Sequence, residues 1–190
     1  MSLQPIVVST KRVKAGGKFK GGITNYQQVR REVRILLQDR GAAAVTTMID
    51  YYGLPADFPG KVGLPRGGSC YQRVAYLEEA FQSDIDDKLF LPYLSLHEFE
   101  ALLLVSPGEI GKALPGQPLL TRLIEETASF ASPEEVNDGP ETHPSARIRR
   151  SAQGYQKRLH GPIIAGRIGL AAIRERCPHF NSWLKRLEGL

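Results

Sequence analysis

Long apolar runs and cysteines are scarce in this chain of 190 residues. No apolar stretch approaches the roughly 18 residues that a membrane-spanning helix needs, so we expect no membrane contact. The two cysteines, Cys70 and Cys177, lie far apart, which gives no disulfide framework and fits a reducing compartment. The N-terminus lacks the charged and hydrophobic segments of a secretory signal. We therefore predict a soluble, cytoplasmic protein.

The phosphate-binding motifs of common nucleotide-dependent enzymes are missing as well. The sequence contains no Gly-x-x-x-x-Gly-Lys-Ser/Thr loop, no Gly-x-Gly-x-x-Gly fingerprint and no Gly-x-Ser-x-Gly elbow. What it does contain is a loop over residues 14–22 with four glycines and three lysines: Lys14, Lys18 and Lys20. Such a loop could bind phosphate through backbone amides and ammonium groups, and we consider these lysines candidate nucleic-acid contacts.

Charge is divided unevenly along the chain. Lys and Arg outnumber Asp and Glu by nine to two in residues 1–40 and by ten to two in residues 147–190, but number six against sixteen in residues 41–146. The balances of +7, +8 and −10 add up to the net +5. If the two basic ends fold onto one side, they would form a surface for phosphates; solvated helix faces are the alternative.

Hydrophobic periodicity indicates an α/β fold. Asn25 is a candidate N-cap for a helix over 26–39, and a second helix is expected from Ser69 or Cys70 to about Ser83. Residues 43–49 form an almost continuous apolar run, which is typical of a strand buried in a parallel sheet, and residues 89–94 predict the next strand. A further helix is expected to begin at Ser95.

The second half of the chain reads as mainly helical. Helices are expected near 107–114, 118–130, 144–151, 161–176 and 181–187, with a polar loop over 131–144 and Pro162 in the first turn of its helix. The length argues for one domain. We therefore predict a single α/β domain with a mostly parallel sheet over about 1–105 and a helical extension over about 106–190.

Acidic residues follow both predicted strands. Asp50 comes directly after the first, and His97, Glu98 and Glu100 come after the second. Because ligands bind outside the carboxyl ends of parallel strands, Asp50 and Glu98 are expected to lie near one edge. Carboxylates gathered in this way favour a hard divalent cation, Mg²⁺ or Mn²⁺, which polarises phosphoryl groups and activates water.

Helical geometry complicates this metal hypothesis. In a helix from Ser95, Glu98 would lie on one flank with His97 and Glu100 on the other, so both glutamates are not expected to bind one ion. Stabilisation of the helix dipole is an alternative role for both, and a loop cap is one for Asp50. Cys177-Pro178-His179 has too few partners for structural zinc.

A second basic cluster precedes Gly161. Together with Tyr155, the side chains of Lys157, Arg158 and His160 could bind an anion near the start of a helix. Lys157 could stabilise the charge that develops on a phosphoryl group, or it could be an ordinary surface lysine.

Several of these segments together resemble one known family, the bacterial domain of unknown function numbered four-two-seven-six. The resemblance covers nearly the whole chain and is carried by Phe19-x-Gly21-Gly22, Thr46–Pro55, Asp57–Gly60, Pro92–Leu103, Tyr155-x-Lys157-x-x-His160-Gly161 and Cys177–Phe180. That family looks TOPRIM-like, similar to the nuclease domains of overcoming-lysogenization-defect proteins. Its members are often encoded beside an AAA or ABC-type ATPase, which suggests anti-phage defence or DNA repair.

The resemblance implies a particular set of ligands. Asp50 matches the first member of the TOPRIM Asp-x-Asp pair, whereas Tyr52 replaces the second, leaving Glu98 or Glu100 as substitutes. The family's opening strand with its glutamate is missing, so we expect an N-terminally truncated chain. The resulting hypothesis is a metal-dependent phosphodiesterase of nucleic acid, DNA rather than RNA. The alternatives are a non-catalytic partner of the ATPase and a pure nucleic-acid-binding module.

Overall fold

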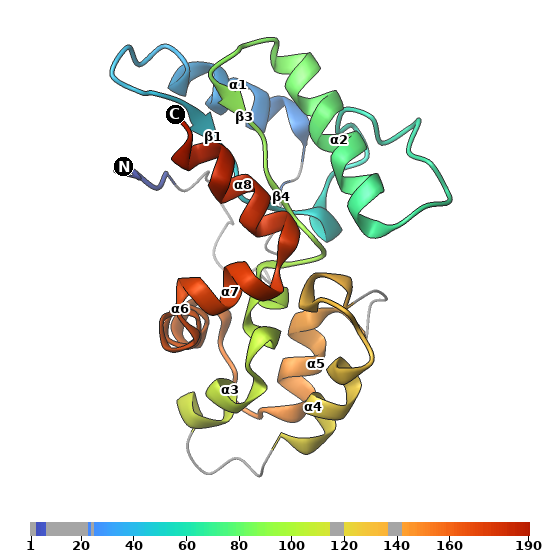
Figure 1. Ribbon diagram of the computed structural model, residues 1–190. Helices are drawn as coiled ribbons and strands as arrows, with labels where there is room; N and C mark the ends of the chain where they lie inside the picture. The colour runs from blue at the N-terminus through green and yellow to red at the C-terminus, as the bar shows by residue number, and fades with distance from the viewer. Residues whose placement is uncertain (1–2, 7–22, 24, 115–119, 137–141) are drawn as a thin grey trace, which may run out of the picture. The chain divides into compact units, whose positions relative to one another are not determined.

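The chain forms two compact units in the computed structural model, which describes residues 3–6, 23, 25–114, 120–136 and 142–190 (Figure 1). The first unit comprises Met1–Leu94 together with Arg186–Leu190, and the second comprises Ser95–Lys185. The sequence predicts one domain, which would mean that the two units unfold together. This stays a prediction.

Two capped helices dominate the first unit. α1 (Tyr26–Leu36) begins after Asn25, whose side chain accepts a hydrogen bond from the Gln28 N–H at 2.9 Å. α2 (Cys70–Ile85) begins with a reciprocal capping box in which Ser69 and a glutamine three residues later bond to each other's backbone N–H. Both helices confirm the sequence prediction, although α1 ends three residues before the expected position 39.

Short strands give the first unit its α/β character. They are β1 (Val45–Thr46), β2 (Ile49–Asp50), β3 (Phe90–Leu91) and β4 (Leu94–Ser95). β1 pairs with β3 in parallel, and β2 pairs with β4 at the point where the first unit ends. The α/β class is confirmed, but each of the two predicted strands is split. Pro92 cannot donate a ladder hydrogen bond, and the Thr47 hydroxyl bonds to the Tyr93 N–H and C=O at 3.1 Å.

An aromatic cluster forms the core of this unit. The rings of Tyr26, Phe58, Phe81 and Phe90 pack edge to face with centroids 4.7–5.6 Å apart. The Gly- and Pro-rich segment from 51 to 68 contains η1 (Tyr51–Gly53) and is anchored through buried Phe58. Both carboxylate oxygens of Asp57 also accept from the Tyr26 N–H. This segment is thus held against the start of α1.

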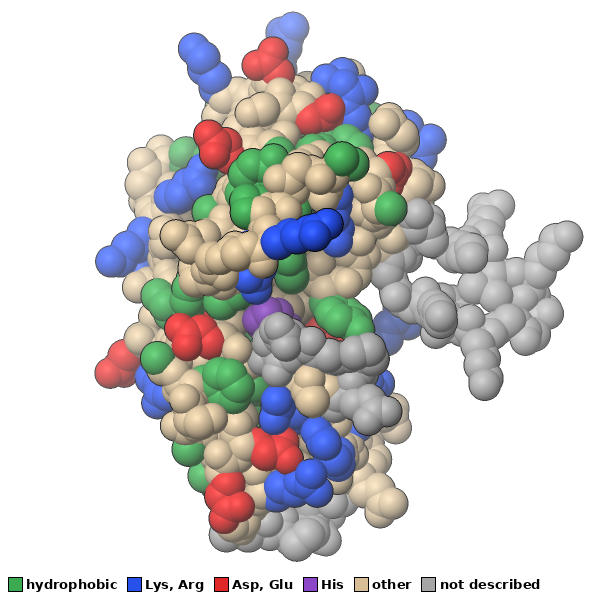
Figure 2. All heavy atoms as spheres, turned by 90° about the vertical axis from the view of Figure 1, so that its right-hand side faces the viewer, with side chains coloured by type: hydrophobic (Ala, Val, Ile, Leu, Met, Phe, Trp, Pro, Cys, Tyr) green, Lys and Arg blue, Asp and Glu red, His purple; other side chains and the backbone are tan. Residues whose placement is uncertain are grey.

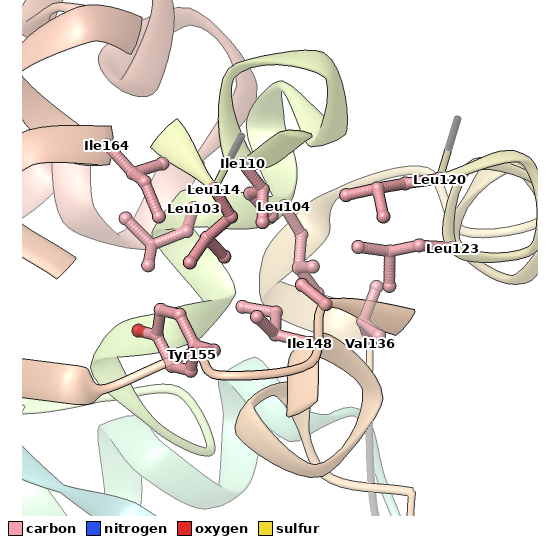
Figure 3. Packing of buried hydrophobic residues seen from close by; sticks show 11 residues of the cluster. Leu103, Leu104, Ile110, Leu114, Leu120, Leu123, Val136, Ile148, Tyr155 and Ile164 are labelled. Carbon is pink, nitrogen blue, oxygen red and sulfur yellow. The ribbon is translucent and has the colours of Figure 1, made fainter. Parts of the chain in front are cut away.

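The second unit is helical, as the sequence predicted for this half. Its elements are η2 (Phe99–Val105), α3 (Pro107–Ala113), α4 (Thr121–Ala128), η3 (Pro133–Glu135), α5 (Pro144–Ser151), α6 (Lys157–Ile168), α7 (Leu170–Arg176) and α8 (Pro178–Glu188), of which α8 ends in the first unit. η2 packs against α3, α5, α6 and α7. Its residues Leu103 and Leu104 lie in a buried apolar cluster with Ile110, Leu123, Ile148 and Ile164 (Figure 3).

Two helix boundaries differ from the prediction. Ser95 belongs to β4 rather than to a helix, because the chain turns at His97, a non-glycine residue with φ of 64°. The predicted helix over 161–176 is two helices, since α6 begins at Lys157 and ends at Ile168, before Gly169, where φ is 82°. Pro162 therefore lies inside α6 and not in its first turn.

Surface charge on the visible face of each unit is mixed in sign (Figure 2). Lys and Arg side chains are interspersed there with Asp and Glu. Between α4 and α5, Glu126 pairs with Arg122, Arg147 and Arg150. None of the helices in the described ranges is long and apolar enough to cross a membrane.

Candidate functional site

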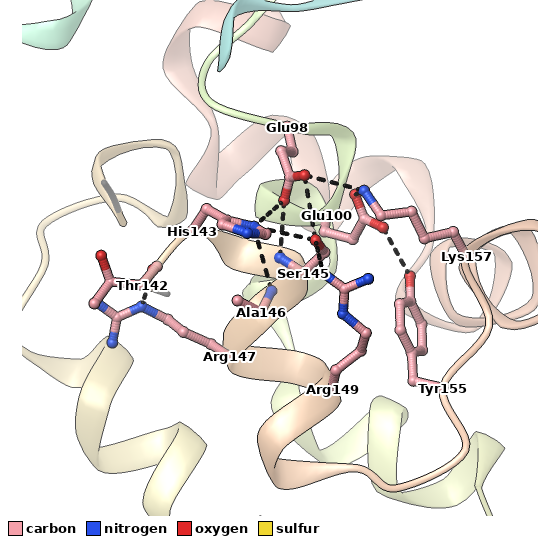
Figure 4. A network of polar contacts seen from close by, with 10 residues as sticks. All are labelled: Glu98, Glu100, Thr142, His143, Ser145, Ala146, Arg147, Arg149, Tyr155 and Lys157. Atoms are coloured by element: carbon pink, nitrogen blue, oxygen red, sulfur yellow. Dashed lines mark hydrogen bonds and ion pairs between the residues drawn. The ribbon is translucent and has the colours of Figure 1, made fainter. Parts of the chain in front are cut away.

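A buried network of charged side chains lies inside the second unit (Figure 4). Glu98 and Glu100 come from the start of η2, His143 and Ser145 from the start of α5, and Lys157 from the first residue of α6. The side chains of the two glutamates are only 9% and 2% exposed. The start of η2 therefore meets two segments that lie 45 to 59 residues further along the chain.

The backbone around residue 97 decides where Glu98 points. His97 adopts a left-handed conformation, and Glu98 follows in an extended one with φ of −152°. Conformations of the first kind cost about 1–3 kcal/mol and persist only where the surrounding structure enforces them. The predicted placement of Glu98 and Glu100 on opposite helix flanks was therefore wrong, because Glu98 precedes the helix.

Glu98 is held ionised by the groups that its carboxylate contacts. Oε2 accepts from the Ser145 N–H at 2.9 Å and lies 3.0 Å from His143 Nδ1, while Oε1 accepts from Lys157 Nζ at 3.0 Å and from the Ser145 hydroxyl at 3.2 Å. Burial alone would raise the pKa of this carboxyl, but the Ser145 N–H and the Lys157 ammonium outweigh burial and lower the pKa to about 2.

Glu100 and Lys157 form the other half of the network. Lys157 Nζ donates to Glu100 Oε2 at 3.1 Å, and the Tyr155 hydroxyl donates to Oε1 at 3.3 Å. Burial raises the pKa of Glu100, and the nearby charge of Glu98 adds to this effect. Burial would lower the pKa of Lys157, but the Glu100 and Glu98 carboxylates outweigh it and raise the pKa. Lys157 is therefore an ammonium ion at neutral pH, and its side chain is 43% exposed.

His143 and Ser145 are hydrogen-bonding groups of the network. His143 Nδ1 lies 3.0 Å from Glu98 Oε2 and accepts from the Ala146 N–H at 3.3 Å, so His143 also caps the start of α5. Ser145 Oγ lies 3.2 Å from the same nitrogen and donates to Glu98, and the residue is fully buried. Sequence reasoning named Tyr155 but missed Ser145, His143 and Arg149. Arg149 donates to Ser145 Oγ at 3.3 Å.

The network offers hard oxygen ligands to a cation. Glu98 Oε1 and Glu100 Oε2 lie within 3.1 Å of a single cationic nitrogen, so both carboxylates converge on one position. Mg²⁺ is commonly held by one or two carboxylates together with water and substrate phosphates, and this donor pair fits it. Across residues 3–6, 23, 25–114, 120–136 and 142–190, no group of three or more His, Cys, Asp or Glu side chains is gathered in metal-binding geometry.

The remaining predicted site residues are distributed over the chain. Asp50 is the last residue of β2 and half-buried, but it belongs to the first unit, so its convergence with Glu98 stays a prediction. Arg158 is exposed on α6. His160 Nδ1 accepts from the Gln156 N–H at 2.9 Å and so caps that helix. Lys14, Lys18 and Lys20 lie outside the described residues.

The segment from 177 to 180 has a structural role. Buried Glu134 accepts from the His179 and Phe180 N–H groups at 2.9 Å and so caps the start of α8. Cys177 is buried, and burial raises the pKa of its thiol.

Comparison with known proteins gives one result. Residues 1–188 match a family described as Domain of unknown function (DUF4276). The chain belongs to this family. No curated protein and no solved structure showed significant similarity to this DUF4276 member. The resemblance carried by the motifs around Asp50, Glu98 and Lys157 is thereby confirmed at the level of the family, and two of those three residues lie in the buried network.

Proposed function

We propose that this DUF4276 protein is a metal-dependent phosphodiesterase that cleaves nucleic acid, with Glu98, Glu100 and Lys157 at its active site. The observation that supports the proposal is the convergence of two carboxylates and one ammonium group at a single position. Purely structural ion pairs seldom bury two like charges side by side, because each loses its hydration and repels the other. An active site gains from such an arrangement.

The charge of each side chain determines its proposed role in the reaction. Glu98 stays ionised at any pH above about 2 and is therefore an anionic ligand under all physiological conditions. Lys157 stays protonated and reaches solvent, so its ammonium can contact a phosphate oxygen and stabilise the negative charge that develops there. Tyr155 and Ser145 hold the two glutamates in place through hydrogen bonds.

A divalent cation, Mg²⁺ or Mn²⁺, would be held by Glu98 and Glu100, with Asp50 as the third predicted ligand. When bound, it would polarise the phosphoryl group and supply an activated water. The chain's own residues set the local charge, because two carboxylates exceed the single ammonium of Lys157 by one unit, which favours cation binding.

The resemblance suggests the biological setting. It implies a TOPRIM-like nuclease acting on DNA rather than RNA in the cytoplasm, together with an AAA or ABC-type ATPase and in the service of phage defence or DNA repair.

The proposal is tested by cleavage of plasmid and single-stranded DNA in Mg²⁺ or Mn²⁺, with and without the neighbouring ATPase. Glu98→Gln, Lys157→Met and Asp50→Asn should each lower the cleavage rate at least about 100-fold. Glu109→Gln, which alters a surface ion pair with Lys112, is the matched control. Trp183 fluorescence checks that each variant is folded. Absence of cleavage by the folded protein under all conditions would overturn the proposal.

A further inference from the structure

α1 carries a polar face on the side that is turned away from the aromatic core. Its opposite side, with Tyr26, Val29 and Val33, is buried in the first unit. The outer side surrounds a shallow depression of about 330 Å³. The residues that line it are Gln27, Arg30, Arg31, Arg34, Ile35 and Gln38. Three guanidinium groups and two amides thus share one surface.

Positive charge on this face exceeds its local compensation. Arg30 Nε pairs with Asp84 at 2.8 Å, and an Arg34 amine nitrogen lies 3.4 Å from the backbone carbonyl of the same aspartate. Arg31 contacts Glu32 at 3.3 Å, but its side chain is 69% exposed, and exposed pairs of this kind interact weakly. Two carboxylates therefore face three guanidinium groups, and Arg31 and Arg34 are the ones that reach outward.

The spacing of the arginines is unfavourable unless an anion binds. Residues three or four apart are neighbours on a helix, so Arg34 lies beside both Arg30 and Arg31 and repels them. A helix kept in water by charge alone would gain from alternating signs. Asp84 offsets this repulsion for Arg30 and fixes the orientation of the face.

We propose that the α1 face binds the backbone phosphates of a nucleic acid, an inference that rests on the proposed function and names the surface that holds its substrate. Guanidinium groups form bidentate hydrogen bonds with phosphate, and glutamine amides add further donors. From Gln27 to Ile35 the helix rises about 12 Å, which equals the axial length of roughly three to four base pairs of duplex. The surface therefore spans several phosphates.

The inference is tested by binding rather than by cleavage. Affinity for a short duplex is measured by fluorescence anisotropy in EDTA over a range of salt concentrations, with Arg31→Gln/Arg34→Gln compared with the wild-type chain. Because each lost phosphate contact lowers the slope of log K against log salt by about 0.9, the double variant should lower the slope by about 2 and the affinity at 0.1 M salt by about tenfold or more.

Arg122→Gln/Arg150→Gln is the matched control. It also removes two arginines next to one glutamate, Glu126, and Arg122 is 66% exposed. The control should leave the slope nearly unchanged. Both double variants should unfold within a few degrees of the wild-type midpoint, because the α1 arginines that are replaced do not hold the core together.

The possible outcomes distinguish nucleic-acid binding by the α1 face from the proposed nuclease activity. An unchanged slope and affinity in Arg31→Gln/Arg34→Gln, or an equal loss in the control, would overturn the inference. Displacement of the duplex by polyglutamate at equal charge concentration would overturn it in favour of an acidic protein segment. Binding through α1 without any cleavage in metal would leave this inference standing and remove the proposed activity. Cleavage in metal together with unaltered duplex binding by Arg31→Gln/Arg34→Gln would support the proposed activity and overturn the inference about α1.

Discussion

Replacement of Glu98 by glutamine should destabilise the second unit by an amount that depends on pH. Glu98 has an ordinary pKa of 4.5 when unfolded and about 2 when folded, so the folded protein binds the proton less tightly. The ionised carboxylate therefore contributes stability above pH 4.5, and this contribution is lost as the pH falls toward 2. The difference in pKa corresponds to about 3 kcal/mol at pH 7 and roughly half of that at pH 3.

Trp183 provides the assay. It is the only tryptophan of the chain, it is buried in α8, and it lies in the second unit. Denaturant unfolding followed by its fluorescence at pH 7, 5, 4 and 3 should show a gap between wild type and Glu98→Gln that narrows as pH falls. At pH 7 the gap corresponds to about 6–12 °C in melting temperature. Glu109→Gln should differ from wild type by less than about 1 kcal/mol at every pH. A Glu98→Gln protein as stable as wild type, or a gap independent of pH, would refute the reasoning.

Three further substitutions are expected to act through single causes. Glu134→Ala should lower the free energy of unfolding by about 2 kcal/mol, because it leaves two backbone N–H groups at the start of α8 without their acceptor; Trp183 fluorescence would show it, and no loss would argue against the cap. Gly169→Ala should cost about 1–2 kcal/mol in the same assay, since φ of 82° with ψ of 147° suits glycine alone and no atom lies within 4 Å of the added carbon; an unchanged midpoint would contradict this. Tyr155→Phe should cost about 1 kcal/mol by removing the hydrogen bond to Glu100, with circular dichroism unchanged; a stabilised variant would show that this bond is not formed.

The helices were predictable where local chemistry determines them. Asn25 and Ser69 predict the starts of α1 and α2, because their side-chain oxygens can accept hydrogen bonds from backbone N–H groups of the first turn. The structure has both caps. The strands were less predictable, because a continuous apolar run does not reveal where pairing stops. Pro92 interrupts the second run because it has no N–H to donate. The hydrogen bond that the Tyr93 N–H makes there goes to the hydroxyl of Thr47, which lies 46 positions away in the sequence.

The charged residues of the candidate site could be predicted from the sequence, but their arrangement in space could not. Glu98, Glu100 and Lys157 stood out from the sequence as acidic and basic residues near element ends. Their meeting depends on the left-handed turn at His97, and no pattern in the sequence marks a histidine for that conformation. Ser145 was missed because a serine near a helix start is ordinary; only the tertiary fold brings its N–H to Glu98.

The division of the chain into its two units also has a consequence for biosynthesis. The second unit is one uninterrupted stretch, Ser95–Lys185, whereas the first needs Arg186–Leu190 in addition to its N-terminal part. A ribosome therefore delivers every residue of the second unit before the first unit has all of its own. The usual order, in which the N-terminal part of a protein is completed first, is reversed here. When residue 185 has been added, the second unit has its whole sequence, whereas the first unit still lacks five residues.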